Sequence, residues 1–134
     1  MRDYLADLII RIKNAQKAGL PEVPMHPYLP KRYLKILHLL YREGYIRGYV
    51  EHWDVTKGKL IVKVLLKYSV RGEPIIEDVF QISKPGRRIY TSIKALWQPK
   101  GGRGLIVLAT TKGFLSDRDA RFLNLGGEVL FGIY

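Results

Sequence analysis

Apolar residues recur at helical spacing in two segments of the first half of the chain. The first set predicts a helix over about residues 3–18, with Gly19 as its stop. The second set predicts a helix over about residues 31–43, with Gly44 where a C-cap residue belongs. The positions that carry the two predictions are Leu5, Leu8, Ile9, Ile12 and Ala15, and then Leu34, Leu37, Leu40 and Tyr41.

The stretch between these helices and the stretch after them predict strands. Four prolines between positions 21 and 30 keep the chain extended and leave room for one short strand around Val23–His26. Residues 59–68 also predict a strand, because Leu60, Val62, Val64 and Leu66 alternate with a second set of positions. That second set is Lys59, Ile61, Lys63, Leu65 and Lys67. We predict that residues 45–53 pair with this strand as a hairpin, joined by a turn around Lys57-Gly58.

In the second half we predict strands near 76–83, 87–91, 105–110 and 127–133, and a helix near 117–124. Helices and strands are mixed without a regular βαβ alternation, so the predicted fold class is α+β.

The chain of 134 residues is long enough for one compact unit or for two very small, closely packed domains. The stretch from Ser69 to Pro74 contains a Gly and a Pro between apolar runs and is typical of a boundary. We therefore predict an N-terminal α/β domain over 1–72 and a C-terminal domain of mainly antiparallel strands over 73–134.

The composition indicates an anionic partner. The chain has 23 Lys and Arg against 12 Asp and Glu, a formal net charge of +11. This excess opposes compactness by self-repulsion, and a nucleic acid, an acidic membrane surface or an acidic protein would neutralise it. The absence of Cys excludes disulfides and thiolate metal sites. We expect no membrane partner, because the apolar stretches are far shorter than the ~20 residues of a membrane span, and we read Met1-Arg2-Asp3 as the start of neither a signal peptide nor a transit peptide.

The cations are segregated from the acids along the chain. No Asp or Glu lies at positions 23–42, 55–72 or 79–116, and Lys and Arg lie in all three intervals. Clustered cations favour phosphate contacts with counterion release, so we predict a nucleic-acid-binding surface rather than ordinary solvated faces. The cations of the longest interval are Lys84, Arg87, Arg88, Lys94, Lys100, Arg103 and Lys112.

Catalytic patterns are weak by comparison. His26, His38 and His52 lie on separate predicted elements, and His52 with Asp54 makes only a loose base and carboxylate pair on one strand face. The glycine-rich stretch 101–104 precedes a strand rather than a helix, so it lacks the context of a phosphate cradle. We expect no enzyme, no metal, no cofactor and no small-molecule substrate.

The most suggestive local segment is Ser83-Lys84-Pro85-Gly86-Arg87-Arg88-Ile89-Tyr90. Its Pro-Gly step predicts a tight turn, its arginines offer planar donor forks to phosphates, and Tyr90 is of a type that stacks on a ribose or an unpaired base. The alternative is a hairpin turn with Tyr90 in the core, and the residues alone favour neither.

A second segment is Ala109-Thr110-Thr111-Lys112-Gly113. Hydroxyls at a strand end can bond to base edges or 2′-hydroxyls in a shallow RNA groove. The alternative is a strand-to-helix loop with ordinary capping threonines, and it would be preferred without other evidence.

Taken in order, the motifs of the chain resemble the bacterial-type family of small-subunit ribosomal protein eight. The resemblance runs from end to end, with each segment in the expected order and spacing. The segments that carry it are Arg11-Ile12-Lys13-Asn14, Glu43-Gly44-Tyr45-Ile46, Leu66-Lys67-Tyr68, Ser83–Tyr90, Thr110–Gly113, Asp117-Arg118 and Gly126-Gly127-Glu128-Val129.

The resemblance implies a two-domain protein whose C-terminal domain binds the central domain of small-subunit ribosomal RNA and supports platform assembly beside neighbouring ribosomal proteins. It also implies that Glu128 lies beside the hydroxyl-rich loop, and we expect Glu128 to hold the Thr111 hydroxyl towards a base. The RNA-binding residues we predict are Ser83, Lys84, Pro85, Gly86, Arg87, Arg88, Tyr90, Arg103, Gly104, Thr110, Thr111, Lys112, Gly113 and Glu128, with Arg11, Lys13, Asn14 and Lys31 on a second RNA segment or nearby.

The chain departs from the usual family pattern at a few positions. Ala109 replaces a hydroxyl residue, Thr111 replaces a serine, and Phe114 replaces an aliphatic residue. The aromatic C-terminus, with Phe131 and Tyr134, resembles mitochondrial members, so beyond the ribosome itself we predict the mitochondrial matrix over a bacterial cytoplasm.

Two other functions stay open at this point. One is a free RNA-binding regulator, for example of its own messenger, which co-sedimentation with small subunits would separate from a ribosomal role. The other is a basic enzyme acting on nucleic acid, which would need paired carboxylates near the basic loops. Glu128 and Asp117 are the only candidates there, and neither has a partner in the sequence.

Overall fold

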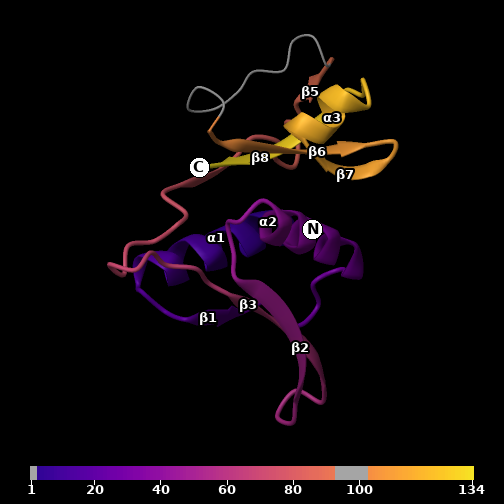
Figure 1. The fold of residues 1–134 in the computed structure, drawn as a ribbon. Helices are drawn as coiled ribbons and strands as arrows, with labels where there is room; N and C mark the ends of the chain where they lie inside the picture. The colour runs from indigo at the N-terminus through magenta and orange to yellow at the C-terminus, as the bar shows by residue number, and fades with distance from the viewer. Residues whose placement is uncertain (1–2, 93–102) are drawn as a thin grey trace. The chain divides into compact units, whose positions relative to one another are not determined.

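The computed structural model describes residues 3–92 and 103–134 (Figure 1). The chain divides into two compact units, residues 1–76 and 77–134. Each unit combines an antiparallel sheet with at least one helix, which confirms the predicted α+β class.

The first helix, α1 (Tyr4–Lys17), forms where its apolar spacing predicts it. Asp3 caps its N-terminus, and its carboxylate accepts the backbone N–H of Ala6 at 3.1 Å. Gly19 follows the helix with φ +73°, a left-handed conformation that glycine adopts without steric cost. The buried face of α1 consists of Leu5, Leu8, Ile9, Ile12, Ala15 and Gln16.

The second predicted helix begins with a tighter turn. Residues Lys31–Tyr33 form the 3-10 segment η1, and α2 continues it over Leu34–Arg42. Such 3-10 turns are frequent at helix N-termini, and Pro30 at the N-cap makes no side-chain hydrogen bond to the first amides. Ile36 and Leu37 on α2 are fully buried, so the helix is anchored by its apolar face.

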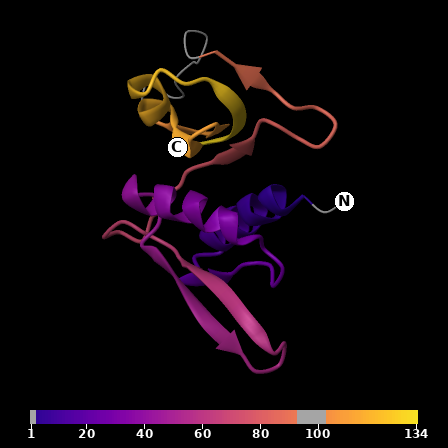
Figure 2. The same ribbon diagram turned by 90° about the vertical axis from the view of Figure 1, so that its right-hand side faces the viewer.

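The sheet of the first unit has three antiparallel strands in the order β1-β3-β2, so β2 is an outer strand. The strands are β1 (Glu22–Pro24), β2 (Gly48–Asp54) and β3 (Lys59–Leu65). Figure 2 shows the β2–β3 hairpin projecting beyond the two helices of this unit. The hairpin is confirmed, although both of its strands are shorter than the predicted ranges.

The stretch predicted as the domain boundary is a closed turn. The N–H of Ser69 donates to the carbonyl of Glu73 at 2.8 Å, and the N–H of Gly72 donates to the carbonyl of Ser69 at 2.9 Å. The two compact units meet along the chain after Ile76. The boundary between Ser69 and Pro74 stays a prediction.

The second unit is built on a sheet in which β8 is the central strand. The path of the sheet is β4-β8-β6-β7, and the short β5 also pairs with β8, all pairs being antiparallel. The helix α3 contacts β6 and β7 (Figure 1). The elements are β4 (Val79–Gln81), β5 (Tyr90–Thr91), β6 (Leu105–Thr110), β7 (Gly113–Ser116), α3 (Asp117–Phe122) and β8 (Gly127–Ile133).

The core of the second unit lies between the sheet and α3. Ile106 and Leu108 from β6, Ala120 from α3 and Val129 from β8 form a buried cluster. Ser116 caps α3 through its hydroxyl, which accepts the N–H of Asp119 at 3.1 Å. This packing fixes the positions of β6 and β8, whose ends carry the residues considered next.

Candidate nucleic-acid interface

The segment after β4 forms the tight turn that its Pro-Gly step predicts. The N–H of Lys84 donates to the carbonyl of Arg87 at 3.1 Å, and the N–H of Arg87 donates back to the carbonyl of Lys84 at 2.9 Å. Gly86 has φ +81°, as the third residue of a type II turn requires. The turn exposes every side chain from Lys84 to Arg88.

Ser83 anchors this turn rather than projecting from it. The residue is buried, and its hydroxyl accepts the N–H of Ile89 at 2.9 Å and donates to the carbonyl of Ile89 at 3.3 Å. The N–H of Ser83 also donates to the carbonyl of Leu130 on β8 at 3.2 Å. The two ends of the loop are therefore tied together, and the loop is tied to the sheet.

Tyr90 lies on the surface and is 70% exposed. The alternative in which Tyr90 packs into the core is therefore wrong, although the segment before it does form a turn. Tyr90 begins the short strand β5, which pairs with β8. Its phenol remains available to a partner.

Tyr90 is the first of four side chains that form a row across the sheet. Tyr90 pairs with Glu128, Glu128 pairs with Ala109, and Ala109 pairs with Phe114. Residues that pair directly across strands project from the same face of a sheet. The row therefore places an exposed aromatic ring, a carboxylate, a methyl group and a second aromatic ring next to one another.

Glu128 is held by the basic turn. Arg88 Nη1 donates to Glu128 Oε2 at 3.2 Å, and the side chains are 49% and 17% exposed respectively. The expectation that Glu128 accepts a hydrogen bond from Thr111 is wrong, because the partner that the structure gives Glu128 is Arg88. The carboxylate orients a guanidinium instead of a hydroxyl.

The Thr110–Gly113 segment is a two-residue hairpin turn between β6 and β7. The Thr110 hydroxyl donates to the carbonyl of Gly113 at 2.9 Å and accepts the N–H of Lys112 at 3.1 Å, so it is used within the turn. Thr111 and Lys112 are exposed at the tip. The alternative of a strand-to-helix loop with capping threonines is wrong, because β7 intervenes and Ser116 is the cap.

Gly127 lets the start of β8 lie against the end of β6. A Cβ atom at Gly127 would lie 2.3 Å from the carbonyl oxygen of Ala109 and 3.1 Å from Cγ2 of Thr110. Only glycine fits at such a close approach of two backbones. The Gly-Gly-Glu sequence thereby brings Glu128 next to the β6–β7 turn.

Arg103 and Gly104 are not brought to this place. They precede Leu105, which pairs with Ile133 at the far end of β6 from Thr110, about 20 Å away for a strand of this length. Gly104 is buried, whereas Arg103 is exposed. Of the other predicted cations of this half, Lys94 and Lys100 lie outside the described residues.

The remaining predicted residues belong to the first unit. The guanidinium of Arg11 is occupied there, because Nε donates to Asp7 at 2.7 Å and Nη1 donates to the carbonyl of Pro24 at 3.1 Å. Lys13 is half-buried and Asn14 is exposed on α1, and Lys31 is exposed at the start of η1.

The arrangement is suited to an anionic partner and poorly suited to catalysis. Asp117 is buried and accepts a hydrogen bond from Arg121 at 2.9 Å, so it is not paired with Glu128 as two catalytic carboxylates would be. Within residues 3–92 and 103–134, no group of three or more His, Asp or Glu side chains could hold a metal ion. No helix in this described part of the chain is long and apolar enough to cross a membrane.

Two features of the interface were missed from the sequence. Strand β7 was hidden because the turn before it is only two residues long and the strand itself has four. The Arg88–Glu128 pair joins residues that are 40 positions apart, and no local signal connects them.

These features define a small, basic α+β protein that presents two cationic turns at one end of a sheet. Comparison with known families then places it: the profile of the family described as Ribosomal protein S8 matches residues 3–134. The chain belongs to the ribosomal protein S8 family, as the resemblance of its motifs had indicated.

Similar proteins cover the chain almost completely. The small ribosomal subunit protein uS8 of Nitrobacter winogradskyi is 43% identical, with 98% of this chain and 97% of the relative covered. The protein of the same name from Gluconacetobacter diazotrophicus is 42% identical, with coverage of 100% and 98%. That from Nitrobacter hamburgensis is 45% identical, with coverage of 98% and 97%.

Proposed function

We propose that this chain is a structural, non-enzymatic constituent of the small ribosomal subunit and binds its ribosomal RNA through one end of the second unit. The observation that carries the site is the convergence of two exposed turns on β8, with the Arg88–Glu128 pair at one turn and Gly127 against the other. Family membership supports the ribosomal role, since the relatives are named as small-subunit proteins.

The chemistry of the surface supports a division of tasks. Lys84, Arg87 and Lys112 are exposed cations placed to contact phosphates. Tyr90 offers a ring for stacking on an unpaired base, and Thr111 offers a hydroxyl for a base edge or a 2′-hydroxyl. Phosphate contacts fix the position of the RNA, while the stacking and hydroxyl contacts give specificity.

Several predicted residues act indirectly or fall outside this surface. Ser83, Pro85, Gly86 and Thr110 shape the turns, and Gly113 completes the second one with φ +97°. We exclude Arg11 and Gly104 from direct RNA contact because one is paired and the other is buried. In our proposal Lys13 and Asn14 on α1 contact a second RNA segment, and Arg103 contacts a different part of the RNA from the two turns.

We propose the central domain of the ribosomal RNA as the binding region and neighbouring small-subunit proteins as further partners. The prediction of a mitochondrial matrix rests on the aromatic C-terminus, and the bacterial relatives give it no support. Packing accounts for that C-terminus equally well, because Phe131 is buried and the ring centroid of Tyr134 lies 6.3 Å from that of Phe80.

A salt titration of RNA binding tests the site. Arg87→Ala should flatten the slope of log K against log salt by about one, because one phosphate contact is lost. Arg71→Ala removes the same charge from an exposed turn of the first unit and should leave the slope unchanged. The measurement is filter binding to a central-domain fragment of small-subunit ribosomal RNA, and equal slopes for the two variants would overturn the site.

A further inference from the structure

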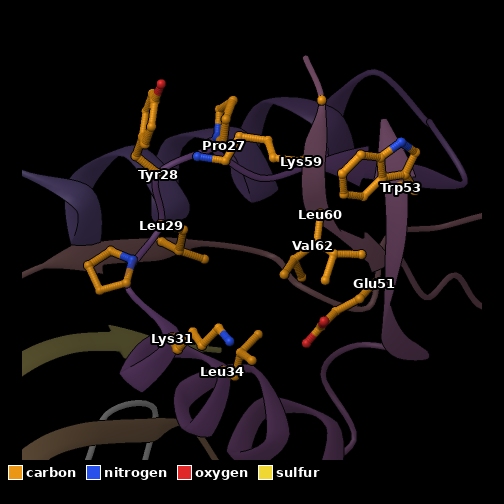
Figure 3. Close-up of a pocket in the computed structure, with 12 residues that line it drawn as sticks. Pro27, Tyr28, Leu29, Lys31, Leu34, Glu51, Trp53, Lys59, Leu60 and Val62 are labelled. Carbon is orange, nitrogen blue, oxygen red and sulfur yellow. The ribbon is translucent and has the colours of Figure 1, made fainter. Parts of the chain in front are cut away.

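The first unit contains an open pocket that the RNA-binding surface does not use. Its volume is about 490 Å³, and all of its lining residues lie between Pro27 and Val62. One wall is the segment 27–31 together with Leu34 of α2, and the other is the face of the β2–β3 hairpin (Figure 3).

The walls of this pocket expose large apolar side chains. Tyr28 is 67% exposed, Trp53 is 60% exposed and Leu60 is 52% exposed. Leu34 and Val62 also line the pocket and are half-buried. Grouped exposed apolar side chains of this size mark interaction sites on monomeric proteins.

Contacts within the first unit hold one wall of the pocket in place. The N–H of Tyr28 donates to Nδ1 of His26 at 3.0 Å, and the N–H of Leu29 donates to the carbonyl of His26 at 3.0 Å. Two prolines in the same wall, Pro27 and Pro30, further restrict the backbone. Lys59 Nζ lies 3.5 Å from the centre of the Tyr28 ring and holds that ring in place. A wall ordered in advance lowers the entropy cost of docking.

The charges of the pocket indicate the kind of partner. Lys31, Lys59 and Glu51 are its charged lining residues, a net charge of one positive. Lys59 is engaged with Tyr28, whereas Lys31 is an exposed residue that lines the pocket beside Leu34. Figure 3 shows Lys31 and Glu51 on facing walls. A single carboxylate next to an apolar side chain can pair with Lys31 on the wall away from Glu51, whereas the closely spaced phosphates of an RNA strand would also come near Glu51 and be repelled.

The backbone at the pocket can also take part in binding. Among the strands of residues 3–92 and 103–134, β2 has a sheet neighbour on one side only, in the order β1-β3-β2. Both Glu51 and Trp53 lie on this outer strand. An extended segment can therefore pair with the free edge of β2 while it inserts a side chain into the pocket.

We propose that this pocket docks an extended, acidic and apolar segment of a neighbouring protein in the small ribosomal subunit. An apolar side chain of that segment fills the space between Leu34, Leu60 and Val62, and an adjacent carboxylate pairs with Lys31. The proposal uses the ribosomal role given above but not the RNA-binding surface of the second unit.

A photo-crosslink from position 53 tests the proposal. Trp53→p-benzoylphenylalanine keeps a bulky aromatic group at the pocket, and illumination of purified small subunits that contain this variant captures what lies there. We expect a crosslink to protein, and mass spectrometry should identify the captured peptide as acidic and apolar. A crosslink to RNA, a crosslink to a basic peptide, or no crosslink would overturn the docking proposal. Absence of the parent protein itself from purified small subunits would instead count against the ribosomal role.

Paired variants distinguish an effect at the pocket from a general effect of charge or polarity. In the crosslinking background, Lys31→Glu should lower the crosslink yield at least about tenfold, which corresponds to ~1.4 kcal/mol. Lys35→Glu makes the same charge change on the exposed side of α2, outside the lining, and should leave the yield near that of the parent. Leu60→Asn should likewise lower the yield, whereas Val55→Asn at the exposed hairpin tip should not. Equal effects within either pair would overturn the proposal.

Discussion

The two units of this protein differ in how their charge is arranged more than in how much they carry. Residues 1–76 contain 14 Lys and Arg against 7 Asp and Glu, a net +7, whereas residues 77–134 contain 9 against 5, a net +4. Net charge alone would therefore assign RNA binding to the first unit. We place it on the second unit instead, because Lys84, Arg87, Arg88 and Lys112 lie on two turns at one end of a sheet.

Several cations of the first unit bind acidic side chains or carbonyl groups within the same unit. Arg11 pairs with Asp7 on α1 and reaches the carbonyl of Pro24, which ties the helix to β1. Lys63 pairs with Glu22 at 3.1 Å across the sheet between β3 and β1. Exposed pairs of this kind contribute little to stability, about 0–1 kcal/mol each, but they reduce the local positive charge.

The second unit uses its pair differently. The Glu128 carboxylate limits the motion of the Arg88 guanidinium, which lies in the same turn as the exposed cations Lys84 and Arg87. A guanidinium held in place loses less entropy when it binds a phosphate. We therefore expect the Glu128 carboxylate to support RNA binding, because it orients the Arg88 guanidinium.

The largest effect is expected at the close approach of β8 and β6. Gly127→Ala would place a Cβ 2.3 Å from the Ala109 carbonyl oxygen, so the strands must separate. We expect the free energy of unfolding to fall by about 1–3 kcal/mol, as for other overpacked sites, and RNA affinity to fall more than tenfold because both turns move. Urea denaturation followed by circular dichroism and filter binding would measure the two effects.

A glycine of the first unit is the control for that experiment. Gly58 has φ +63° but open space around it, so Gly58→Ala strains only a local turn. It should cost about 1 kcal/mol of stability and leave RNA affinity unchanged. Parent-like RNA binding by Gly127→Ala would mean that the turns do not need this approach.

The next effect concerns Glu128 and opposes simple electrostatics. Glu128→Gln removes a negative charge from a surface that faces a polyanion, which by charge alone should strengthen binding. We expect about tenfold weaker binding instead, because the guanidinium of Arg88 loses the partner that orients it. Glu51→Gln makes the same change in the first unit and should leave affinity at the parent value or slightly above it.

A double variant tests whether Glu128 acts through Arg88. If Glu128 acts through Arg88, the loss for Glu128→Gln with Arg88→Ala should be smaller than the sum of the two single losses. Strict additivity would show that the two side chains act separately.

The sequence predicted those parts of the fold that depend on local pattern. The two helices of the first unit follow from apolar spacing, and the turn at Pro85-Gly86 follows from the φ values that these residues favour. Charge segregation located the basic segments for the same reason, since it is visible along the chain.

The parts that sequence reasoning missed depend on contacts between distant segments. The neighbours of Tyr90 are set by the sheet order, in which β5 pairs with β8 rather than with the strand after it. Glu128 was expected to hold Thr111, but the register of β8 brings it within reach of Arg88. The apolar pocket was also missed, because its two walls come from residues 27–34 and 51–62, which show ordinary patterns when they are read separately.

A smaller effect is expected at the tip of the β6–β7 turn. Thr111→Val keeps the shape of the side chain and removes an exposed hydroxyl that does not support the turn. If this hydroxyl bonds to RNA, its loss should cost about 0.5–1.5 kcal/mol of binding free energy with the salt slope unchanged, since no phosphate contact is lost. Filter binding at two salt concentrations would measure both quantities. Thr56→Val in the hairpin of the first unit is the control, and equal affinities for the two variants would exclude the Thr111 contact.

The smallest effect belongs to the turn of the β2–β3 hairpin. The hydroxyl of Thr56 donates to Asp54 Oδ1 at 2.6 Å. This bond, together with the backbone N–H groups of Thr56 and Lys57, holds the pKa of Asp54 below its ordinary value of 3.8, although desolvation acts in the opposite direction. Because the pKa is lower in the folded state, the ionised carboxylate stabilises the turn above the unfolded-state pKa, and this contribution is lost as the pH falls through the folded-state pKa. A carboxyl titration by NMR from about pH 6 to about pH 2 should therefore give Asp54 a midpoint below 3.8. Asp54→Asn should loosen the hairpin slightly and leave RNA affinity at neutral pH unchanged, because this turn is not part of the RNA-binding surface. A midpoint at or above the ordinary value would show that the turn does not hold the carboxylate, and weaker RNA binding by Asp54→Asn would extend the RNA-binding surface to the first unit.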